Sequence, residues 1–284
     1  MQKIAANIVT YNRLGFLKEI IEALRNQTRK LDAIIVINNS STDGTKEWLE
    51  SQNDLIIINQ GNFGSSGGQY TGFKTVYDRG FDWIWTMDDD VVPKSDCLEL
   101  LFAGFDENTI RTPLRLTTGG EPFMNDAISY NLTNPFKSIW KDIYSQNNLN
   151  EEFTDAIGIT FEGPLIHRSV LDKIGYPDKK FFIYGDDTEY FIRAWKAGFR
   201  IIVKRDAILQ RKLDYQGDPS IFNWKTYYFI RNIIAIDVLH GNFSVRWLRP
   251  FGYLLTWLMR SRKVSDIKTV LKGFFDSYFY KSDK

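Results

Sequence analysis

Two clusters of carboxylates are the residues of this chain best suited to chemistry. The first, Asp88-Asp89-Asp90, follows an apolar run at 83–87. Alternate side chains of an extended backbone share a side, so Asp88 and Asp90 can act on one ligand. Hard cations such as Mg²⁺ or Mn²⁺ prefer oxygen ligands and are often shared with substrate phosphates. Because three adjacent carboxylates repel one another, the cluster favours a divalent-metal site over a simple turn.

The second cluster is Asp186-Asp187-Thr188-Glu189. One interpretation is structural, because Asp186 and Glu189 have the spacing of a capping box at the start of a helix. The other is catalytic, because a carboxylate near a diphosphate-bearing substrate can take a proton from an incoming hydroxyl. Both can hold together, with Asp186 capping the helix and Asp187 acting as the base.

Polar residues also follow three other apolar runs. They are Thr10-Tyr11-Asn12-Arg13, the Asn-Asn-Ser-Ser segment at 38–41 and the Asn-Gln-Gly-Asn segment at 59–62. Each segment taken alone is typical of a turn. In an open α/β sheet, however, ligands bind beyond the carboxyl ends of the strands. Four such ends in succession therefore predict one shared polar site.

Apolar runs and helical periodicities alternate over the first hundred residues. Strands are predicted at 4–10, 33–37, 55–58 and 83–87, and helices at 14–24, 46–51 and 68–78. This alternation predicts an α/β fold with a mostly parallel sheet flanked by helices. Later segments predict a loop at 145–152, a helix at 188–197, a strand at 199–203 and a helical region from 223 onward.

Several common motifs are missing from the sequence. The glycine-rich stretch at 61–68 lacks the Lys-Ser/Thr of a Walker A loop, and no Gly-x-Gly-x-x-Gly follows the first strand. No Gly-x-Ser-x-Gly nucleophile elbow occurs. The single cysteine, Cys97, excludes an intramolecular disulfide and a cysteine-based zinc site. With only His167 and His240 as histidines, a multi-histidine metal centre is not expected.

The composition is that of an ordinary globular protein, with 43% hydrophobic and 25% charged residues among 284. The net charge of +1 hides an asymmetry: residues 240–284 carry nine Lys or Arg and three Asp, against 27 basic and 32 acidic residues elsewhere. Apolar residues at 247–258 are flanked by basic ones, and Pro250 suits the first turn of a helix. This tail is expected either to lie on an anionic membrane surface or to pack against the rest of the protein.

In this order, the motifs resemble glycosyltransferase family 2, whose members are inverting enzymes with the GT-A nucleotide-sugar-binding fold. The matching segments are 10–13, 38–45, 62–68, 88–90 and 181–193. The resemblance covers roughly residues 3–211 and looks nearest to bacterial galactofuranosyl- and rhamnosyltransferases. Trp-x-Met-Asp-Asp-Asp-Val, Phe-Phe-Ile-x-x-Asp-Asp and the later Tyr227-Tyr-x-x-x-Arg-Asn232 point that way.

The resemblance implies a division of the chain and a role for each matching residue. A catalytic domain would span 1–215, with a donor-binding part at about 1–105 and an acceptor-side part at about 106–215, before a helical, basic and aromatic extension at 216–284. Asp187 would be the general base beside Asp186, and Asp88 and Asp90 would bind Mg²⁺ or Mn²⁺. The donor would contact residues of the strand ends, namely Thr10, Tyr11, Asn12, Arg13, Asn39, Asn62, Gly67, Gly68, Asp88 and Asp89.

Two departures from the family pattern are visible. Many relatives have Asp where this chain has Asn38-Asn39, and many carry a metal-binding His near the position of Arg211. Arg211 is therefore a candidate contact for the donor diphosphate, since a guanidinium pairs well with phosphate oxygens. Alternatively, it is a surface residue of the basic pair Arg211-Lys212.

The implied function is that of a nucleotide-sugar-dependent hexosyltransferase. It would move galactofuranose from UDP-galactofuranose, or rhamnose from dTDP-rhamnose, onto a growing bacterial surface glycan or a lipid-linked acceptor. A non-catalytic carbohydrate-binding protein would leave both acidic clusters unexplained, and a sugar nucleotidyltransferase commonly opens with a glycine-rich basic loop unlike the segment at 10–14.

The expected location is the cytoplasm, including the inner face of the cell membrane. The N-terminus does not read as a signal peptide. The apolar run at 251–259 is far short of the roughly 20 residues that span a bilayer. No nucleic-acid partner is expected, and a homo-oligomer is compatible with the sequence.

Overall fold

The computed structural model describes residues 2–104, 106–124, 127–214 and 222–282. The strands are β1 (Ile4–Thr10), β2 (Ala33–Asn38), β3 (Leu55–Asn59), β4 (Trp83–Asp88), β5 (Val91–Pro93), β6 (Thr109–Leu116), β7 (Ala127–Tyr130), β8 (Trp140–Ile143), β9 (Phe153–Asp155), β10 (Leu165–His167) and β11 (Arg200–Arg211). The helices are α1 (Leu14–Arg25), α2 (Thr45–Glu50), α3 (Gly64–Asp78), α4 (Cys97–Phe102), α5 (Arg168–Ile174), α6 (Asp186–Lys196), α7 (Thr226–His240), α8 (Phe243–Arg260) and α9 (Val264–Tyr278), with short 3₁₀ turns η1 (Gln146–Asn150) and η2 (Lys179–Phe181).

In these ranges a nine-stranded mixed sheet has the order β3-β2-β1-β4-β10-β6-β11-β5, with β9 beside β11. β1 pairs in parallel with β2 on one side and β4 on the other. After β1 the chain thus adds β2 and β3 on one side of it, and then returns to place β4 on the other side. Such a change of direction leaves a crevice at the carboxyl ends of the strands, where ligands bind in open α/β sheets.

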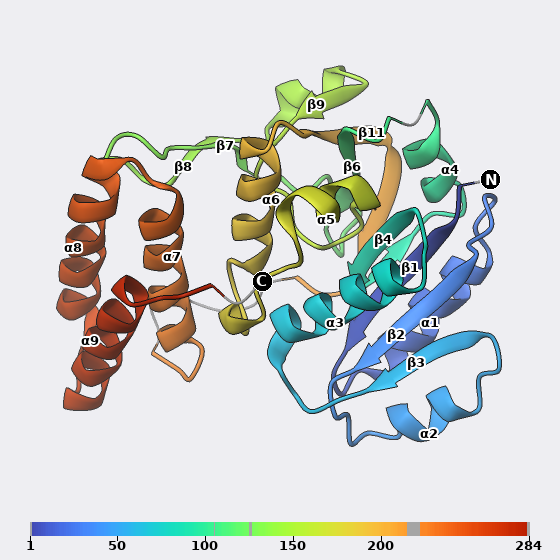
Figure 1. The fold of residues 1–284 in the computed structure, drawn as a ribbon, viewed down its shortest axis with the longest axis horizontal. Helices are drawn as coiled ribbons and strands as arrows, with labels where there is room; N and C mark the ends of the chain where they lie inside the picture. Colours follow the sequence, from blue (N-terminus) through green and yellow to red (C-terminus); the bar gives the residue numbers. More distant parts are fainter. Residues whose placement is uncertain (1, 105, 125–126, 215–221, 283–284) are drawn as a thin grey trace.

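Helices cover both faces of this sheet, and β1 is buried along its whole length (Figure 1). Ala5 and Val9 of β1 belong to a cluster with residues of α3, α5 and α6. Ile4 and Ile8, which point the other way, belong to a cluster with α1, α2 and α4. A strand covered on both faces reads as a continuous apolar run, which explains why β1 was predictable from sequence.

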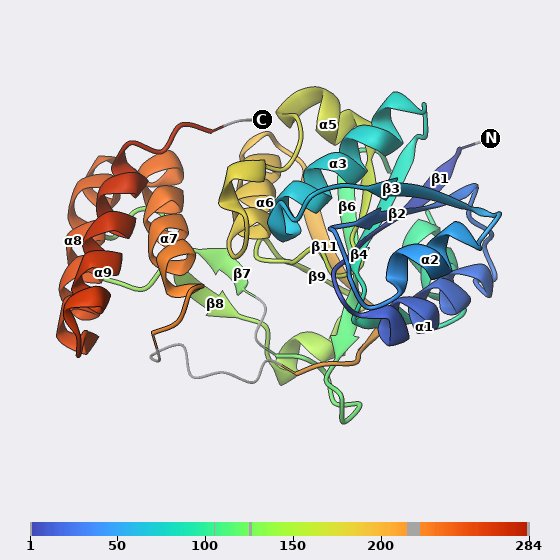
Figure 2. The ribbon, with the colours of Figure 1, turned by 90° about the horizontal axis from the view of Figure 1, so that it is seen from below.

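Helices α7, α8 and α9 form a bundle beside the sheet (Figure 2). A third apolar cluster joins Ile234 of α7, Trp257 of α8 and Val270 of α9 to Phe181 and Ile192, which come from the segment around α6. The bundle therefore shares its core with the element that carries the second acidic cluster. In the described residues, no helix is both long and apolar enough to cross a bilayer.

Several elements differ from the sequence-based predictions. Residues 145–152, predicted as a loop, contain the 3₁₀ turn η1, whose start is held by Ser145 and Asn148. α3 begins at Gly64, four residues earlier than predicted. Pro250 lies inside α8 and not in its first turn, because the helix begins at Phe243 behind an Asn242 cap. The predicted boundary at 215–216 lies outside the described residues.

Candidate active site

A cleft of about 620 Å³ opens at the carboxyl ends of β1, β2 and β4. It brings together most of the polar residues that the sequence singled out. Those lining it are Thr10, Tyr11, Arg13, Asn39, Asn62, Asp88, Asp89, Asp90, Asp186 and Asp187. Val9 of β1 pairs with Asp88 of β4, so the first strand end and the aspartate triplet are neighbours by sheet register.

The three aspartates of the triplet have different surroundings. Asp89 is buried and accepts hydrogen bonds from Thr10 Oγ1 at 2.7 Å and Arg13 Nη1 at 3.0 Å. Arg13 also donates to Asp90 at 2.7 Å. Burial raises the pKa of Asp90, and burial together with repulsion from Asp90 raises that of Asp88 well above its ordinary value. Burial raises the pKa of Asp89 as well, but Arg13 and Thr10 oppose that rise by stabilising its carboxylate, whereas Asp88 is surrounded by other acids.

Asp88 and Asp90 suit a divalent cation by the chemistry of their donors. Carboxylates that repel one another are stabilised by a cation between them. Among the described residues, no group of three or more His, Cys, Asp or Glu is arranged to hold a metal ion. Mg²⁺ is commonly bound by one or two carboxylates together with substrate phosphates. The pair therefore fits a metal that is completed by a diphosphate.

Glu162 is a cleft residue that was not predicted from the sequence, and neither was its partner Arg115, which lies behind it. Glu162 lines the cleft and forms ion pairs with Arg115 and with Arg211 Nε, the latter at 3.3 Å. Arg211 is therefore not the surface residue of the alternative interpretation: its side chain is only 14% exposed and stacks on Phe123. It is not among the cleft-lining residues and reaches the site through Glu162.

The first two residues of α6, Asp186 and Asp187, line the cleft. Gly185, with φ of 78°, precedes the helix, and no side chain caps the first turn. The predicted capping box is therefore wrong: one carboxylate oxygen of Asp186 is buried without a partner, and Glu189 instead pairs with Arg193 Nε at 2.9 Å. Burial raises the pKa of Asp186 to about 8 and that of Asp187 to about 6.

The remaining donor-site candidates have mainly local contacts. Asn12 accepts a hydrogen bond from Thr42 N at 2.7 Å and is not part of the cleft lining. Asn39 lines the cleft but donates to Gly64 O at 2.9 Å. Gly67 and Gly68 lie within α3, where a Cβ on Gly68 would come within 2.4 Å of Val9. The first residue of α3 in the cleft is Gly64.

A second cavity, of about 230 Å³, lies on the far side of Asp187. Its walls are mostly apolar and aromatic, and they come from the β7–β8 pair, the start of α6 and α7. The lining residues are Tyr130, Ile139, Trp140, Tyr184, Gly185, Asp187, Thr188, Phe229, Asn232, Ile233 and Ile236. Asp187 and Tyr184 border both this cavity and the polar cleft. A carboxylate at such a junction can act between two ligands.

The architecture matches solved glycosyltransferases. The chain is similar to GalNAc-T7, crystallised with UDP, GalNAc and Mn²⁺, at a TM-score of 0.67 and 13% identity over 99% of this chain and 55% of that one. It is also similar to residues 1–349 of Staphylococcus aureus TarS in complex with UDP, at a TM-score of 0.60 and 13% identity over 97% and 81% of the two chains. These likenesses confirm the predicted GT-A fold.

Curated relatives are similar at the sequence level. Galactofuranosyltransferase GlfT1 of Mycobacterium tuberculosis H37Rv is 26% identical over 92% of this chain and 91% of its own length. The Mycolicibacterium smegmatis protein of the same name is 24% identical over 69% and 66%. A Haloferax volcanii hexosyltransferase of low-salt glycan biosynthesis, Agl10, is 22% identical over 90% and 86%. The chain thus spans about two thirds to nine tenths of these relatives.

The family model described as glycosyl transferase family 2 matches residues 6–175, which is more than half of the chain. Its match includes most of β1, the aspartate triplet and Glu162, and it ends before Asp186 and Asp187. Together with the relatives, it confirms the prediction of a nucleotide-sugar-dependent hexosyltransferase at the level of the family. The protein belongs to glycosyltransferase family 2.

Proposed function

We propose that this protein is an inverting glycosyltransferase in which Asp187 activates an acceptor hydroxyl against a nucleotide sugar bound in the polar cleft. The observation that carries the proposal is the position of Asp187, which borders both the carboxylate-rich cleft and the aromatic cavity. A donor in the first and an acceptor in the second would meet at this carboxylate. Its raised pKa, about 6, suits a group that takes up a proton near neutral pH.

The transfer is a single displacement. The acceptor O–H gives its proton to the Asp187 carboxylate as its oxygen bonds to the anomeric carbon. The bond between that carbon and the donor diphosphate breaks, and its electron pair leaves with the nucleoside diphosphate. Attack from the side opposite the leaving group inverts the anomeric configuration, and no covalent enzyme intermediate forms. Asp186 lines only the polar cleft and does not reach the aromatic cavity.

The leaving group is the part of the donor that most needs positive charge. Asp88 and Asp90 would hold Mg²⁺ or Mn²⁺, which neutralises diphosphate charge when bound. Arg13, beside Asp89 and Asp90, offers a guanidinium at the mouth of the cleft, where it remains 41% exposed. Arg211 acts on the same region through Glu162, because that ion pair orients its guanidinium.

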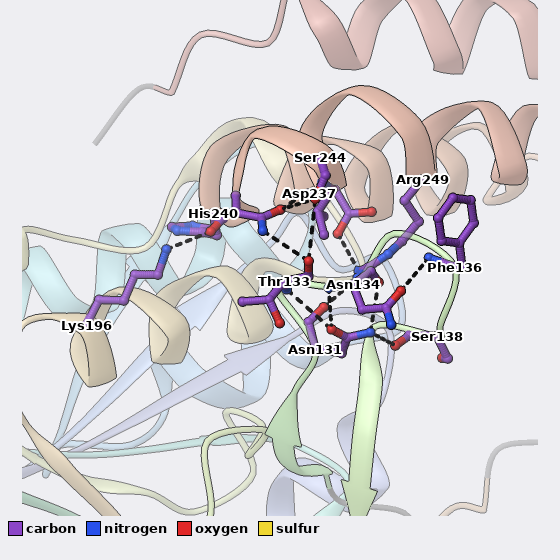
Figure 3. Close-up of polar contacts among 12 residues, drawn as sticks. Asn131, Thr133, Asn134, Phe136, Ser138, Lys196, Asp237, His240, Ser244 and Arg249 are labelled. Atoms are coloured by element: carbon purple, nitrogen blue, oxygen red, sulfur yellow. Dashed lines mark hydrogen bonds and ion pairs between the residues drawn. The ribbon is translucent and has the colours of Figure 1, made fainter.

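The acceptor would enter from the β7–β8 side. Tyr130 and Trp140 line the aromatic cavity and also a groove of about 1060 Å³ beyond it. The groove adds Trp195 and Lys196 of α6, two further lysines, and amides of the β7–β8 connection and the α7–α8 turn. Figure 3 shows Lys196 beside this connection and its residues Asn131 and Asn134. Aromatic faces with convergent polar groups are typical of small-molecule sites. A glycan or lipid-linked acceptor of more than one sugar fits this continuous surface.

Galactofuranose from UDP-galactofuranose is the donor sugar that the relatives favour. Two of them are named galactofuranosyltransferases, and the two structural neighbours were crystallised with UDP. Rhamnose from dTDP-rhamnose is the alternative donor. The product would extend a bacterial surface glycan or a lipid-linked intermediate.

The test is incubation of the protein with a panel of nucleotide sugars and Mn²⁺ while released nucleotide is measured. We expect release from UDP-galactofuranose above the rates with UDP-glucose, UDP-galactopyranose and dTDP-rhamnose. The paired variant Asp88→Ala/Asp90→Ala should weaken donor affinity in calorimetry with Mn²⁺, and this difference should vanish without the metal. Equal donor affinity in wild type and variant would remove the metal claim, and no release from any donor would remove the proposed function.

A further inference from the structure

The segment that precedes Asp186 and Asp187 has an unfavourable backbone conformation. Phe182 has φ of 65° and ψ of −59°, and Ile183 N donates to Phe181 O at 2.7 Å. This is a γ-turn of the rare, strained kind. Tyr184 follows with φ of 67°. Side-chain-bearing residues avoid this left-handed region, so residues 181–185, here called the γ-turn loop, need support from outside.

That support comes from α7. Asn232 is 1% exposed, and its Nδ2 lies 3.0, 2.8 and 2.8 Å from the carbonyl oxygens of Phe181, Ile183 and Tyr184. Two amide hydrogens are therefore shared among three converging carbonyls. Without the amide, the carbonyls of Ile183 and Tyr184 would lose these hydrogen bonds, whereas Phe181 O would still accept from Ile183 N and Arg231 Nη2.

Arg231 fixes the direction of that amide. Its Nε donates to Asn232 Oδ1 at 2.8 Å, which leaves Nδ2 facing the loop. Its Nη2 donates to Lys180 O at 2.6 Å and Phe181 O at 3.0 Å. The Arg231-Asn232 pair of the sequence motif at 227–232 thus donates to four backbone carbonyls. They belong to Lys180, just before the γ-turn loop, and to Phe181, Ile183 and Tyr184 within it.

The opposite side of the loop rests on the donor half of the molecule. Phe182 O accepts a hydrogen bond from Ser66 N of α3 at 3.3 Å. A Cβ on Gly64 would come within 2.0 Å of the same oxygen, so the loop and the start of α3 are in direct backbone contact. The γ-turn loop is therefore held between α3, at the donor cleft, and α7, at the aromatic cavity.

We infer that Asn232, oriented by Arg231, is a positioning residue that sets the place of Asp187 between donor and acceptor by holding the γ-turn loop in its left-handed conformation. The inference rests on the proposed function for the role of Asp187, whereas the clamp itself is a statement about backbone geometry. A side chain that only filled this space would need no N–H groups. Displacement of a catalytic group by about 1 Å is enough to cost on the order of 10²-fold in rate.

The first experiment compares Asn232→Ala with Ile230→Ala. Ile230 is equally buried on α7 but packs towards Gly273 of α9, and its apolar side chain cannot donate a hydrogen bond to the loop carbonyls. With UDP-galactofuranose and Mn²⁺, Asn232→Ala should lower kcat about 10²-fold while the donor KM stays within about threefold. Ile230→Ala should leave both values within about threefold. Equal kcat losses in the two variants, or a kcat of Asn232→Ala near wild type, would overturn the inference.

The second measurement does not depend on the reaction. In amide hydrogen exchange, Asn232→Ala should lose protection at Ile183 and at the first turn of α6, with the cores of α7 and α9 unchanged. If the loop exchanges as in wild type, the clamp is wrong whatever the donor turns out to be. If exchange changes but no nucleotide sugar supports turnover in wild type, the clamp stands and the proposed function fails.

A third comparison uses glycine, which adopts positive φ without strain. In a Tyr184→Gly background, Asn232→Ala should cost several-fold less in kcat than it does in wild type, because the loop no longer needs to be forced into shape. If Asn232→Ala lowers kcat by the same factor in both backgrounds, Asn232 does not act on the backbone conformation. If Asn232→Ala does not fold, Arg231→Met takes its place, since Arg231 is only partly buried. It should show the same kcat and exchange changes at smaller size, and their absence would overturn the inference.

Discussion

Asp186 and Asp187 are adjacent in sequence but face different surroundings. Asp187 borders both the polar cleft and the aromatic cavity and accepts a hydrogen bond from Thr188 N at 2.6 Å, whereas Asp186 borders only the polar cleft. Asp187→Asn keeps the shape and the oxygen that accepts this bond but cannot take up a proton. Turnover should fall about 10²- to 10⁴-fold, while donor affinity measured by calorimetry should change little. Asp186→Asn is the matched control, and near-normal turnover in Asp187→Asn with an inactive Asp186→Asn would assign the base to the other residue.

The pH dependence of the reaction should report the burial of Asp187. Desolvation raises its pKa from 3.8 to about 6, and only the deprotonated form can act as a base. The value of kcat/KM should therefore rise with pH through about 6, and level off above it, because the free enzyme loses this proton. An ordinary exposed carboxylate would give a rise near pH 4. A profile that is flat between about pH 5 and about pH 8 would show that no such group limits the reaction.

At the residue scale, the sequence predicts acids in motifs and misses isolated charges. The aspartate triplet and Asp187 stand in runs of like charge, which have few structural explanations. Glu162 and Arg115 stand alone in apolar segments and meet only when β6 and the segment before β10 come together. The one available signal was a single acid in the apolar stretch at 156–167. The capping prediction for Asp186 was wrong because Gly185 ends the preceding turn at positive φ.

At the element scale, α7, α8 and the β7–β8 connection are joined by one buried ion pair. Arg249 Nη1 donates to Asp237 Oδ1 at 2.9 Å, and its Nη2 donates to the carbonyls of Asn131 and Asn134 at 2.6 and 2.9 Å (Figure 3). Both charged side chains are at least 96% buried, because Arg249 is 4% and Asp237 0% exposed. In the sequence, Arg249 stands among the basic residues of the tail, but in the structure its charge is used inside the protein.

Loss of Arg249 should therefore destabilise the bundle strongly. Arg249→Met removes the donor to the buried Asp237 carboxylate and to the Asn131 carbonyl, whereas Asn134 O still accepts from Asn131 Nδ2. Breaking a buried ion pair in this way costs about 3–5 kcal/mol. Urea unfolding should show a loss of this size. The control is Arg246→Met on the same helix, where the arginine is exposed and the change should stay within about 0.5 kcal/mol. Equal stabilities of the two variants would mean that the ion pair contributes nothing.

Element positions were predictable where burial imposes a period and less so elsewhere. The first four strands are apolar runs because each is covered by helices, and their limits agree with prediction within about one residue. The predicted starts of α3 and α8 were wrong, because glycines in the first turns of α3 and a proline inside α8 concealed where these helices begin. The contact of α7 with the γ-turn loop depends on tertiary packing between segments about 50 residues apart, for which no local pattern exists.

At the scale of the whole molecule, the bundle presents a broad apolar surface that nothing in the described chain covers. α8 and α9 contribute its large side chains, which are 36% to 80% exposed: Phe243, Trp247, Leu248, Phe251, Leu255, Met259, Val264, Ile267, Leu271 and Phe275. Exposed arginines and lysines stand at the α8–α9 turn, at Arg260, Arg262 and Lys263. Trp257 is buried against the bundle core, so the tail both packs on the protein and exposes a second face. Figure 1 shows that α8 and α9 lie at the end of the molecule away from β1, β2 and β3.

We propose that this face lies on an anionic membrane surface, where a lipid-linked acceptor would be found. Apolar side chains would enter the headgroup region, and each nearby basic residue adds about 1 kcal/mol, so the cluster at the α8–α9 turn makes binding sensitive to salt.

The protein should co-sediment with vesicles containing phosphatidylglycerol at low salt and less at high salt. Leu255→Glu/Met259→Glu, which changes two exposed residues one turn apart on α8, should abolish sedimentation without loss of stability, whereas Phe153→Glu on distant β9 should not. A wild-type protein that stays in solution with these vesicles at low salt would show that the apolar face serves another purpose, and self-association of the same face would then appear as a dimer that Leu255→Glu/Met259→Glu dissociates.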